Sequence, residues 1–208
     1  MKGSLVIIAF FFAGCLISWY LSSYGIAINL DISRYVLYLL MLQVGLSIGS
    51  DKNIIQILKG IRPVLLLVPL ATIIGTLSFT VVASFFISKW NIFDCLAIGS
   101  GFAYYSLSSI LITELKTASS GIQFATELGT IALMANIIRE IMALLGAPVF
   151  AKFFGRLAPI CAGGATTMDT TLPIITKYSG KDMVFIAILH GILVDLSVPF
   201  LVSFFCSF

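Results

Sequence analysis

Long apolar stretches dominate this chain and limit what it can fold into more than any other feature. A transmembrane helix needs about 20 predominantly apolar residues. Seven stretches approach or exceed that length, the sixth being only weakly apolar, and they lie at residues 5–21, 35–48, 63–87, 93–113, 128–150, 159–175 and 183–205. Charged residues are 10% of the chain, against about 25% in a soluble domain. We therefore expect an all-α, polytopic transmembrane helical bundle of about six or seven spans, forming one transporter domain over residues 1–208.

Several classes of function are disfavoured by the same sequence. The basic residues are scattered and form no basic face, so we expect no nucleic-acid partner. The four cysteines have neither a CxxC nor a Cys/His spacing and read as small apolar residues. Nucleotide-loop and HExxH motifs are missing from the sequence. We expect no enzyme, no metal and no cofactor, apart from a coupling H⁺ or Na⁺.

Basic loops predict the orientation in the membrane. Lys52, Lys59 and Arg62 form the densest basic cluster between spans. Cytoplasmic loops carry an excess of Lys and Arg, so this cluster predicts a cytoplasmic N-terminus in a bacterial inner membrane. If residues 159–175 cross the bilayer, however, Lys152 and Arg156 fall outside, against the rule. A re-entrant segment would give other topologies, and both remain open at this point.

Two segments are unlike ordinary lipid-facing helices. Residues 99–109 (GSGFAYYSLSS) and 163–171 (GGATTMDTT) replace bulky aliphatic residues with glycine and hydroxyl residues. Backbone that leaves helical geometry inside a bilayer must be buried in protein or line a wet cavity, and transporters use paired broken helices near the midplane. The alternative is a pair of glycine-rich packing helices. We expect two broken or re-entrant helices that line a transport path, to which Tyr105, Ser106 and Ser109 would contribute.

Arg139 and Glu140 lie inside an apolar run, together with Asn136. Each uncompensated charge there costs about 2.5–3.5 kcal/mol on insertion scales. Neighbouring helical residues point about 100° apart, so the two do not simply neutralise each other. Glu140 would bind a cationic substrate or a coupling proton, with Arg139 holding it in place. The alternative is a structural ion pair with another helix.

A second set of candidates lies in the last two apolar stretches. Asp169, flanked by Thr166, Thr167 and Thr170, is an oxygen-rich cation site by type, although Asp is also a preferred helix N-cap. His190 in the last span could relay protons, but a membrane histidine is more often a packing residue with satisfied hydrogen bonds.

At these segments the chain resembles the lysine exporter family LysO. The matching residues are GSGFAYYSLSSILITE at 99–114, Arg139-Glu140, GATTMDTTLP at 164–173, and Asp182-Met-Val with AILHG at 187–191. The resemblance implies export of L-lysine and its toxic analogues from bacteria against a proton or cation gradient. It also implies that Glu140 matches an intramembrane acidic residue important for export.

The chain departs from the family in one respect. Full-length members carry an additional N-terminal set of helices with another acidic residue, and this chain is similar to the part that follows. We expect a small membrane companion that supplies the missing half, or a homo-oligomer. Two rival functions stay open, which are an ion-coupled carrier of another metabolite and a non-transporting membrane subunit that needs a companion.

Overall fold

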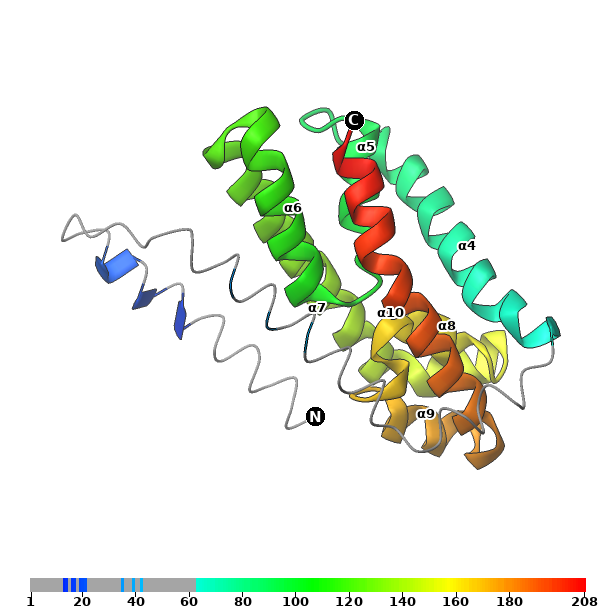
Figure 1. The fold of residues 1–208 in the computed structure, drawn as a ribbon. Helices are drawn as coiled ribbons and strands as arrows, with labels where there is room; N and C mark the ends of the chain where they lie inside the picture. The colour runs from blue at the N-terminus through cyan, green and yellow to red at the C-terminus, as the bar shows by residue number, and fades with distance from the viewer. Residues whose placement is uncertain are drawn as a thin grey trace.

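The computed structural model describes residues 63–208 without a gap and, before them, only the helical positions 13–14, 16–17, 19–21, 35, 39 and 42. The expected spans over 5–21 and 35–48 therefore lie outside the continuous described part. Every regular element within 63–208 is a helix, as Figure 1 shows. The predicted all-α class is confirmed.

Within residues 63–208, three helices are long and apolar enough to cross a membrane. They are α4 (Leu67–Ser84), which follows the short 3-10 helix η1 (Pro63–Leu66), α7 (Ile122–Phe154) and α10 (Val184–Cys206). They fall on the expected spans over 63–87, 128–150 and 183–205. Helix α7 is longer than expected, and its 33 residues extend for about 50 Å at 1.5 Å per residue.

The segment expected to make one crossing over 93–113 is instead a hairpin. Helix α5 (Ile92–Gly99) ends in a non-helical turn, and α6 (Tyr105–Ser120) runs back alongside it. Asp94 at the start of α5 forms a 2.8 Å ion pair with Lys116 near the end of α6, and both side chains are 4% exposed. The two outer ends therefore lie on the same side, so this segment enters the bundle and returns.

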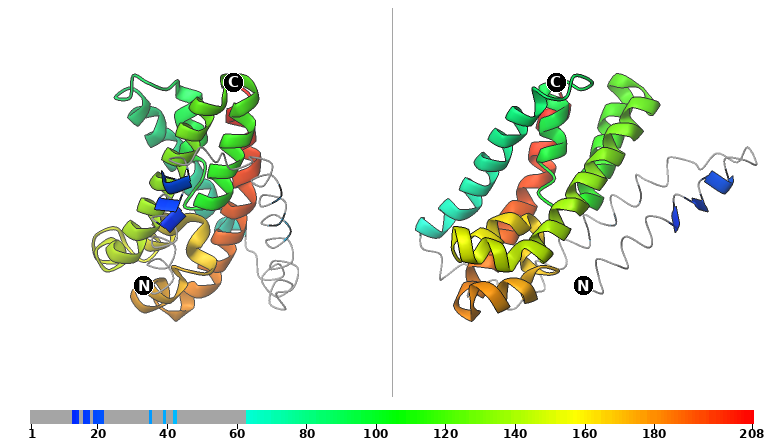
Figure 2. Two further views of the ribbon diagram at one scale, coloured as in Figure 1. Left: turned by 90° about the vertical axis from the view of Figure 1, so that its left-hand side faces the viewer. Right: turned by 180° about the vertical axis from the view of Figure 1, so that it is seen from behind.

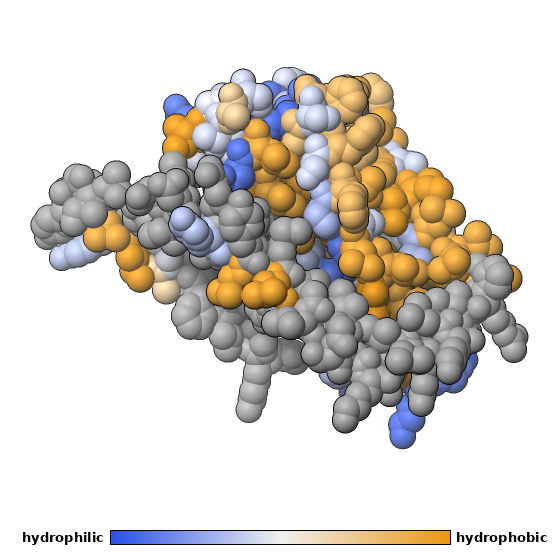
Figure 3. Space-filling model, in the orientation of Figure 1, coloured by the Kyte–Doolittle hydropathy of each residue, from blue (hydrophilic) through white to orange (hydrophobic). Residues whose placement is uncertain are grey.

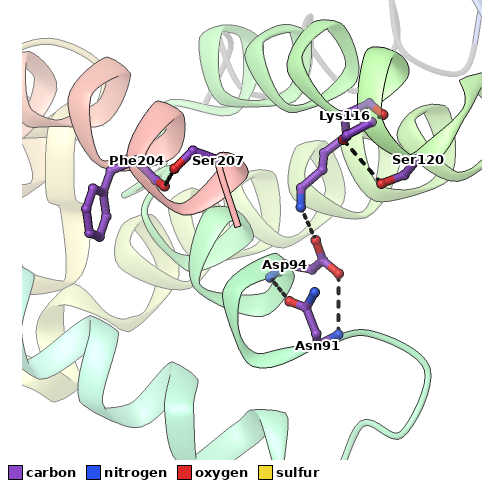
Figure 4. A network of polar contacts seen from close by, with 7 residues as sticks. Asn91, Asp94, Lys116, Ser120, Phe204 and Ser207 are labelled. Carbon is purple, nitrogen blue, oxygen red and sulfur yellow. Dashed lines mark hydrogen bonds and ion pairs between the residues drawn. The ribbon is translucent and has the colours of Figure 1, made fainter.

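Local contacts explain how the hairpin is closed at its open end. Asn91 accepts a hydrogen bond from the Asp94 backbone N–H at 2.7 Å, and the Asp94 carboxylate accepts one from the Asn91 N–H at 3.3 Å. This reciprocal capping box starts α5. The Asp94 carboxylate thus serves the helix cap and the ion pair together, as Figure 4 shows.

The segment over 159–175 is a second hairpin. It consists of α8 (Ala158–Gly163), the 3-10 helix η2 (Gly164–Met168) and α9 (Leu172–Ser179), followed by η3 (Lys181–Met183). Arg156, just before α8, donates to the Ser179 carbonyl oxygen and pairs with Asp182 beyond α9. Its ends therefore also lie together, and the segment doubles back on itself.

The two hairpins enter from opposite ends of the bundle and meet at their tips, as the views in Figures 1 and 2 show. The Ala165 N–H donates to the Phe102 carbonyl oxygen at 2.9 Å. Gly164 has a φ of +60°, and a Cβ there would lie 2.3 Å from the same oxygen, so the contact requires glycine. Phe102 itself is fully buried, and the core around it includes Val194 and Val198 of α10.

The outer surface of the bundle is apolar. Helix α4 is mostly exposed along its length, with Ile74, Phe79 and Val82 among its uncovered side chains. In Figure 3, hydrophobic residues cover much of the described surface on the side where α4 and α10 lie. Such a surface is the one that lipid would cover.

Candidate functional site

The candidate site lies where the hairpin tips meet the middle of α7 and α10. Helix α7 carries Asn136, Arg139 and Glu140, and the sequence placed all three inside an apolar run. In the structure each one faces a different neighbour, because they are spaced around the helix.

Asn136 holds the tip of the first hairpin. Its side-chain oxygen accepts from the Ala103 N–H at 2.8 Å, while its amide nitrogen donates to the carbonyl oxygens of Ala132 at 2.8 Å and Ile98 at 3.4 Å. Phe102 and Ala103 have φ values of 44° and 72°, so the helix cannot continue through them. A buried backbone N–H needs a partner, and Asn136 supplies it where the helix is broken.

Arg139 holds the second hairpin. Its guanidinium donates to the carbonyl oxygens of Ala162 and Cys161, both at 3.1 Å, at the end of α8. It also donates to the Thr76 hydroxyl of α4 at 3.3 Å and lies 5.6 Å from the centre of the Phe102 ring. A cation is favourable at a helix C-terminus, where carbonyl groups lack helical partners. Arg139 therefore binds one hairpin and contacts the other.

Glu140 on α7 is 2% exposed. Tyr105, the first residue of α6, lies close enough to Glu140 and Asp169 for both carboxylates to act on it electrostatically. Its neighbour Tyr104 is in the same relation to Asp169 and Asp195. Carboxylates from α7, the second hairpin and α10 thus act electrostatically on the two tyrosines at the start of α6.

His190 is fully buried between α4 and the second hairpin. Its Nε2 lies 2.9 Å from the Thr72 hydroxyl, and its Nδ1 lies 3.2 Å from the Thr167 hydroxyl. Thr167 also lies 2.8 Å from the Ala187 carbonyl oxygen. Both ring nitrogens therefore have a hydrogen-bond partner, as expected for a histidine that is a packing residue. A role as proton relay stays a prediction.

Asp169, at the tip of the second hairpin, does not form the helix N-cap that the alternative interpretation expects. The exposed Asp169 carboxylate accepts from the adjacent Thr170 N–H, but α9 begins after Thr171 without a side-chain cap. Thr166 instead closes the tip internally by donating to the Gly163 carbonyl oxygen at 2.8 Å. The Asp169 side chain is therefore available to other groups at the tip.

Ser106 and Ser109 lie on α6 with partly exposed side chains. The sequence did not predict Asp195 of α10 as a site residue. Three threonines of α4, Thr72, Thr76 and Thr80, were also not predicted. Their i, i+4, i+8 spacing puts three hydroxyls on one face of an otherwise apolar helix, and that signal could have found them.

Within the part of the chain that the structure describes, no group of three or more His, Cys, Asp or Glu side chains could hold a metal ion. Cys95, Cys161 and Cys206 are free thiols, while Cys15 lies outside the described residues.

Comparisons with known proteins place the chain in a family. The family model described as lysine exporter LysO matches residues 8–206. The lysine exporter LysO of Escherichia coli strain K12 is 34% identical over 181 residues, which cover 85% of this chain and 56% of the relative. A putative lysine exporter of Haemophilus influenzae is 38% identical over 128 residues, which cover 62% of this chain and 60% of the relative.

The chain spans little more than half the length of these curated relatives. No solved structure matches. The family match covers nearly the whole chain and agrees with its helical, membrane-spanning character. This chain belongs to the lysine exporter LysO family.

Proposed function

We propose that this chain is the transport domain of an exporter for L-lysine or a related cationic amino acid. The observation that carries the proposal is the meeting of two re-entrant hairpins at the Ala165–Phe102 hydrogen bond. Discontinuous helices that end near the midplane are the usual site of substrate and ion binding in secondary transporters. Alternating access would separate and rejoin these tips, with H⁺ or Na⁺ as the coupling ion.

The acidic residues around α6 are the proposed cation site. Glu140 would take the substrate ammonium group or the coupling proton, and Asp169 would hold a second cation. Asp195 adds a third carboxylate within electrostatic reach of Asp169. Acidic residues inside a membrane are costly and are usually retained for a substrate or ion pathway. The hydroxyls of Tyr105 and the hairpin threonines would complete an oxygen-rich lining.

The hairpin geometry supports a cytoplasmic location for the open end of the second hairpin. Four basic residues lie near that end, at Lys152, Arg156, Lys177 and Lys181. Among the described residues, the open end of the first hairpin has Lys89 and Lys116, which are paired with Glu127 and Asp94. Because the second hairpin re-enters, Lys152 and Arg156 now lie with Lys177 and Lys181, in agreement with the positive-inside rule. The lysine would leave toward the open end of the first hairpin.

The family resemblance also motivates a proposal about partners. A small membrane companion or a second copy of this chain would complete the transporter. The exposed apolar side chains of α4 and α7 would leave room for such packing as well as for lipid.

The test is lysine release from loaded bacteria that lack their own lysine exporters and express this chain. We expect release with the wild-type chain and loss of release with Glu140→Gln. Glu127→Gln is the matched control, since Glu127 is on the same helix but belongs to an exposed pair with Lys89. Unchanged release with Glu140→Gln would contradict the role of Glu140. A well-inserted chain that is active only with a candidate companion would identify a split exporter.

A further inference from the structure

A cavity of about 280 Å³ lies between α4, α5 and α7, separate from the acidic residues around α6. Arg139 and Asn136 line one end of it, beside the hydroxyls of Thr76 and Thr80 on α4. Trp90 lines it toward the open end of the first hairpin. The cavity thus leads from the hairpin tips in the direction in which the substrate would leave.

Arg139 has donors left over in this cavity. A guanidinium group has five N–H donors, and three of them go to the Ala162 and Cys161 carbonyls and the Thr76 hydroxyl. One N–H on each terminal nitrogen remains. The Thr76 hydroxyl accepts from Arg139 and makes no donated hydrogen bond within residues 63–208. Both residues can therefore donate to a further acceptor.

The charge of Arg139 is also unbalanced within the described part of the chain. All three of its acceptors are neutral, and the ion pairs formed among the described residues involve other side chains. A charged group deep in a membrane protein is usually paired or faces a water-filled cavity. Glu140 does not line the cavity, because neighbouring residues on a helix point about 100° apart.

We propose that this cavity binds the α-carboxylate of the amino-acid substrate, with Arg139 and Thr76 as the residues that donate to it. Arg is the residue best suited to a planar carboxylate because its donors match both oxygens. The two charged groups of the amino acid would then lie on different sides of α7. The ammonium would lie toward Glu140 and the carboxylate toward Arg139. The proposal rests on the proposed function, and it makes the carboxylate a requirement for recognition.

The test compares lysine with cadaverine, which has the same amine-bearing chain but lacks the carboxylate. Binding to the purified full chain is measured as ligand-induced thermal stabilisation, and transport is measured as release of labelled lysine from proteoliposomes with each unlabelled compound as competitor. We expect lysine to bind at least tenfold more tightly than cadaverine. Arg139→Gln should weaken lysine binding at least tenfold more than cadaverine binding, which a general loss of folding would not do.

Thr76→Val provides a second variant, because it keeps the Arg139 charge and side-chain shape while removing the hydroxyl. It should weaken lysine binding severalfold and leave cadaverine unaffected. Thr130→Val is its control, since that hydroxyl is exposed on α7 and bonds only to the Thr126 carbonyl oxygen. It should leave both affinities unchanged.

The outcomes separate this proposal from the proposed function. Lysine release with equal affinities for lysine and cadaverine would overturn the carboxylate site and leave the exporter function standing. Selective lysine binding without release would support the site and contradict the function of this chain alone. A chain that neither binds nor releases lysine would overturn both.

Discussion

Removal of one partner from the buried Asp94–Lys116 pair should strongly destabilise the first hairpin. The two atoms are 2.8 Å apart and both side chains are 4% exposed, so the remaining charge would have little access to water. Breaking a buried pair in this way costs about 3–5 kcal/mol. Lys116→Met and Asp94→Asn should therefore each raise the unfolding equilibrium constant by more than about a hundredfold, at roughly 1.4 kcal/mol per factor of ten.

The double variant gives the sharper test. With both charges removed, no uncompensated ion is left, so the cost should fall short of the sum of the two single costs by at least about 2 kcal/mol. Unfolding can be followed by helical circular dichroism in mixed micelles as the fraction of SDS is raised. Lys89→Met is the control, because the Lys89–Glu127 pair is 61% and 38% exposed and should be worth at most about 1 kcal/mol.

Two results would refute this reasoning. If Lys116→Met cost no more than Lys89→Met, the pair would not be buried as the structure has it. If the single costs simply added in the double variant, the two charges would not be energetically coupled. Either result would show that the Asp94–Lys116 pair is not the main contact that fixes the open end of this hairpin.

Two further changes test the tips. Gly164→Ala should destabilise the bundle by about 1–3 kcal/mol, because the new Cβ would lie 2.3 Å from the Phe102 carbonyl oxygen at a positive φ. Gly75→Ala, in a helix with nothing within 4 Å of the new Cβ, should instead be neutral or slightly stabilising in the same micelle assay. Asn136→Ala should cost about 1–3 kcal/mol because it leaves the buried Ala103 N–H without its acceptor. A loss no greater than that of a surface substitution would show that Asn136 does not hold the tip.

The apolar stretches were sufficient to predict helices α4, α7 and α10, because each one needs only length and low polarity to be stable in lipid. The glycine- and hydroxyl-rich composition likewise indicated where the helices break. Composition could not tell a broken crossing from a hairpin, since both have the same apolar length. That choice depends on whether the ends are joined, as Asp94 and Lys116 join them in the first hairpin.

The sequence by itself determined that the chain is a helical membrane protein with polar groups at Asn136, Arg139, Glu140 and Asp169. Charges are rare inside apolar runs, so their positions are visible without a structure. Only the tertiary structure decided which groups meet. Asn136 and Arg139 are three residues apart on α7 yet bind the tips of different hairpins. Their hydrogen bonds join residues 33 and 23 positions apart in the chain, so they depend on how the chain turns back. For the same reason the sequence does not show that Thr76 belongs to the site. It does so because α4 packs beside α8 and brings the Thr76 hydroxyl to Arg139.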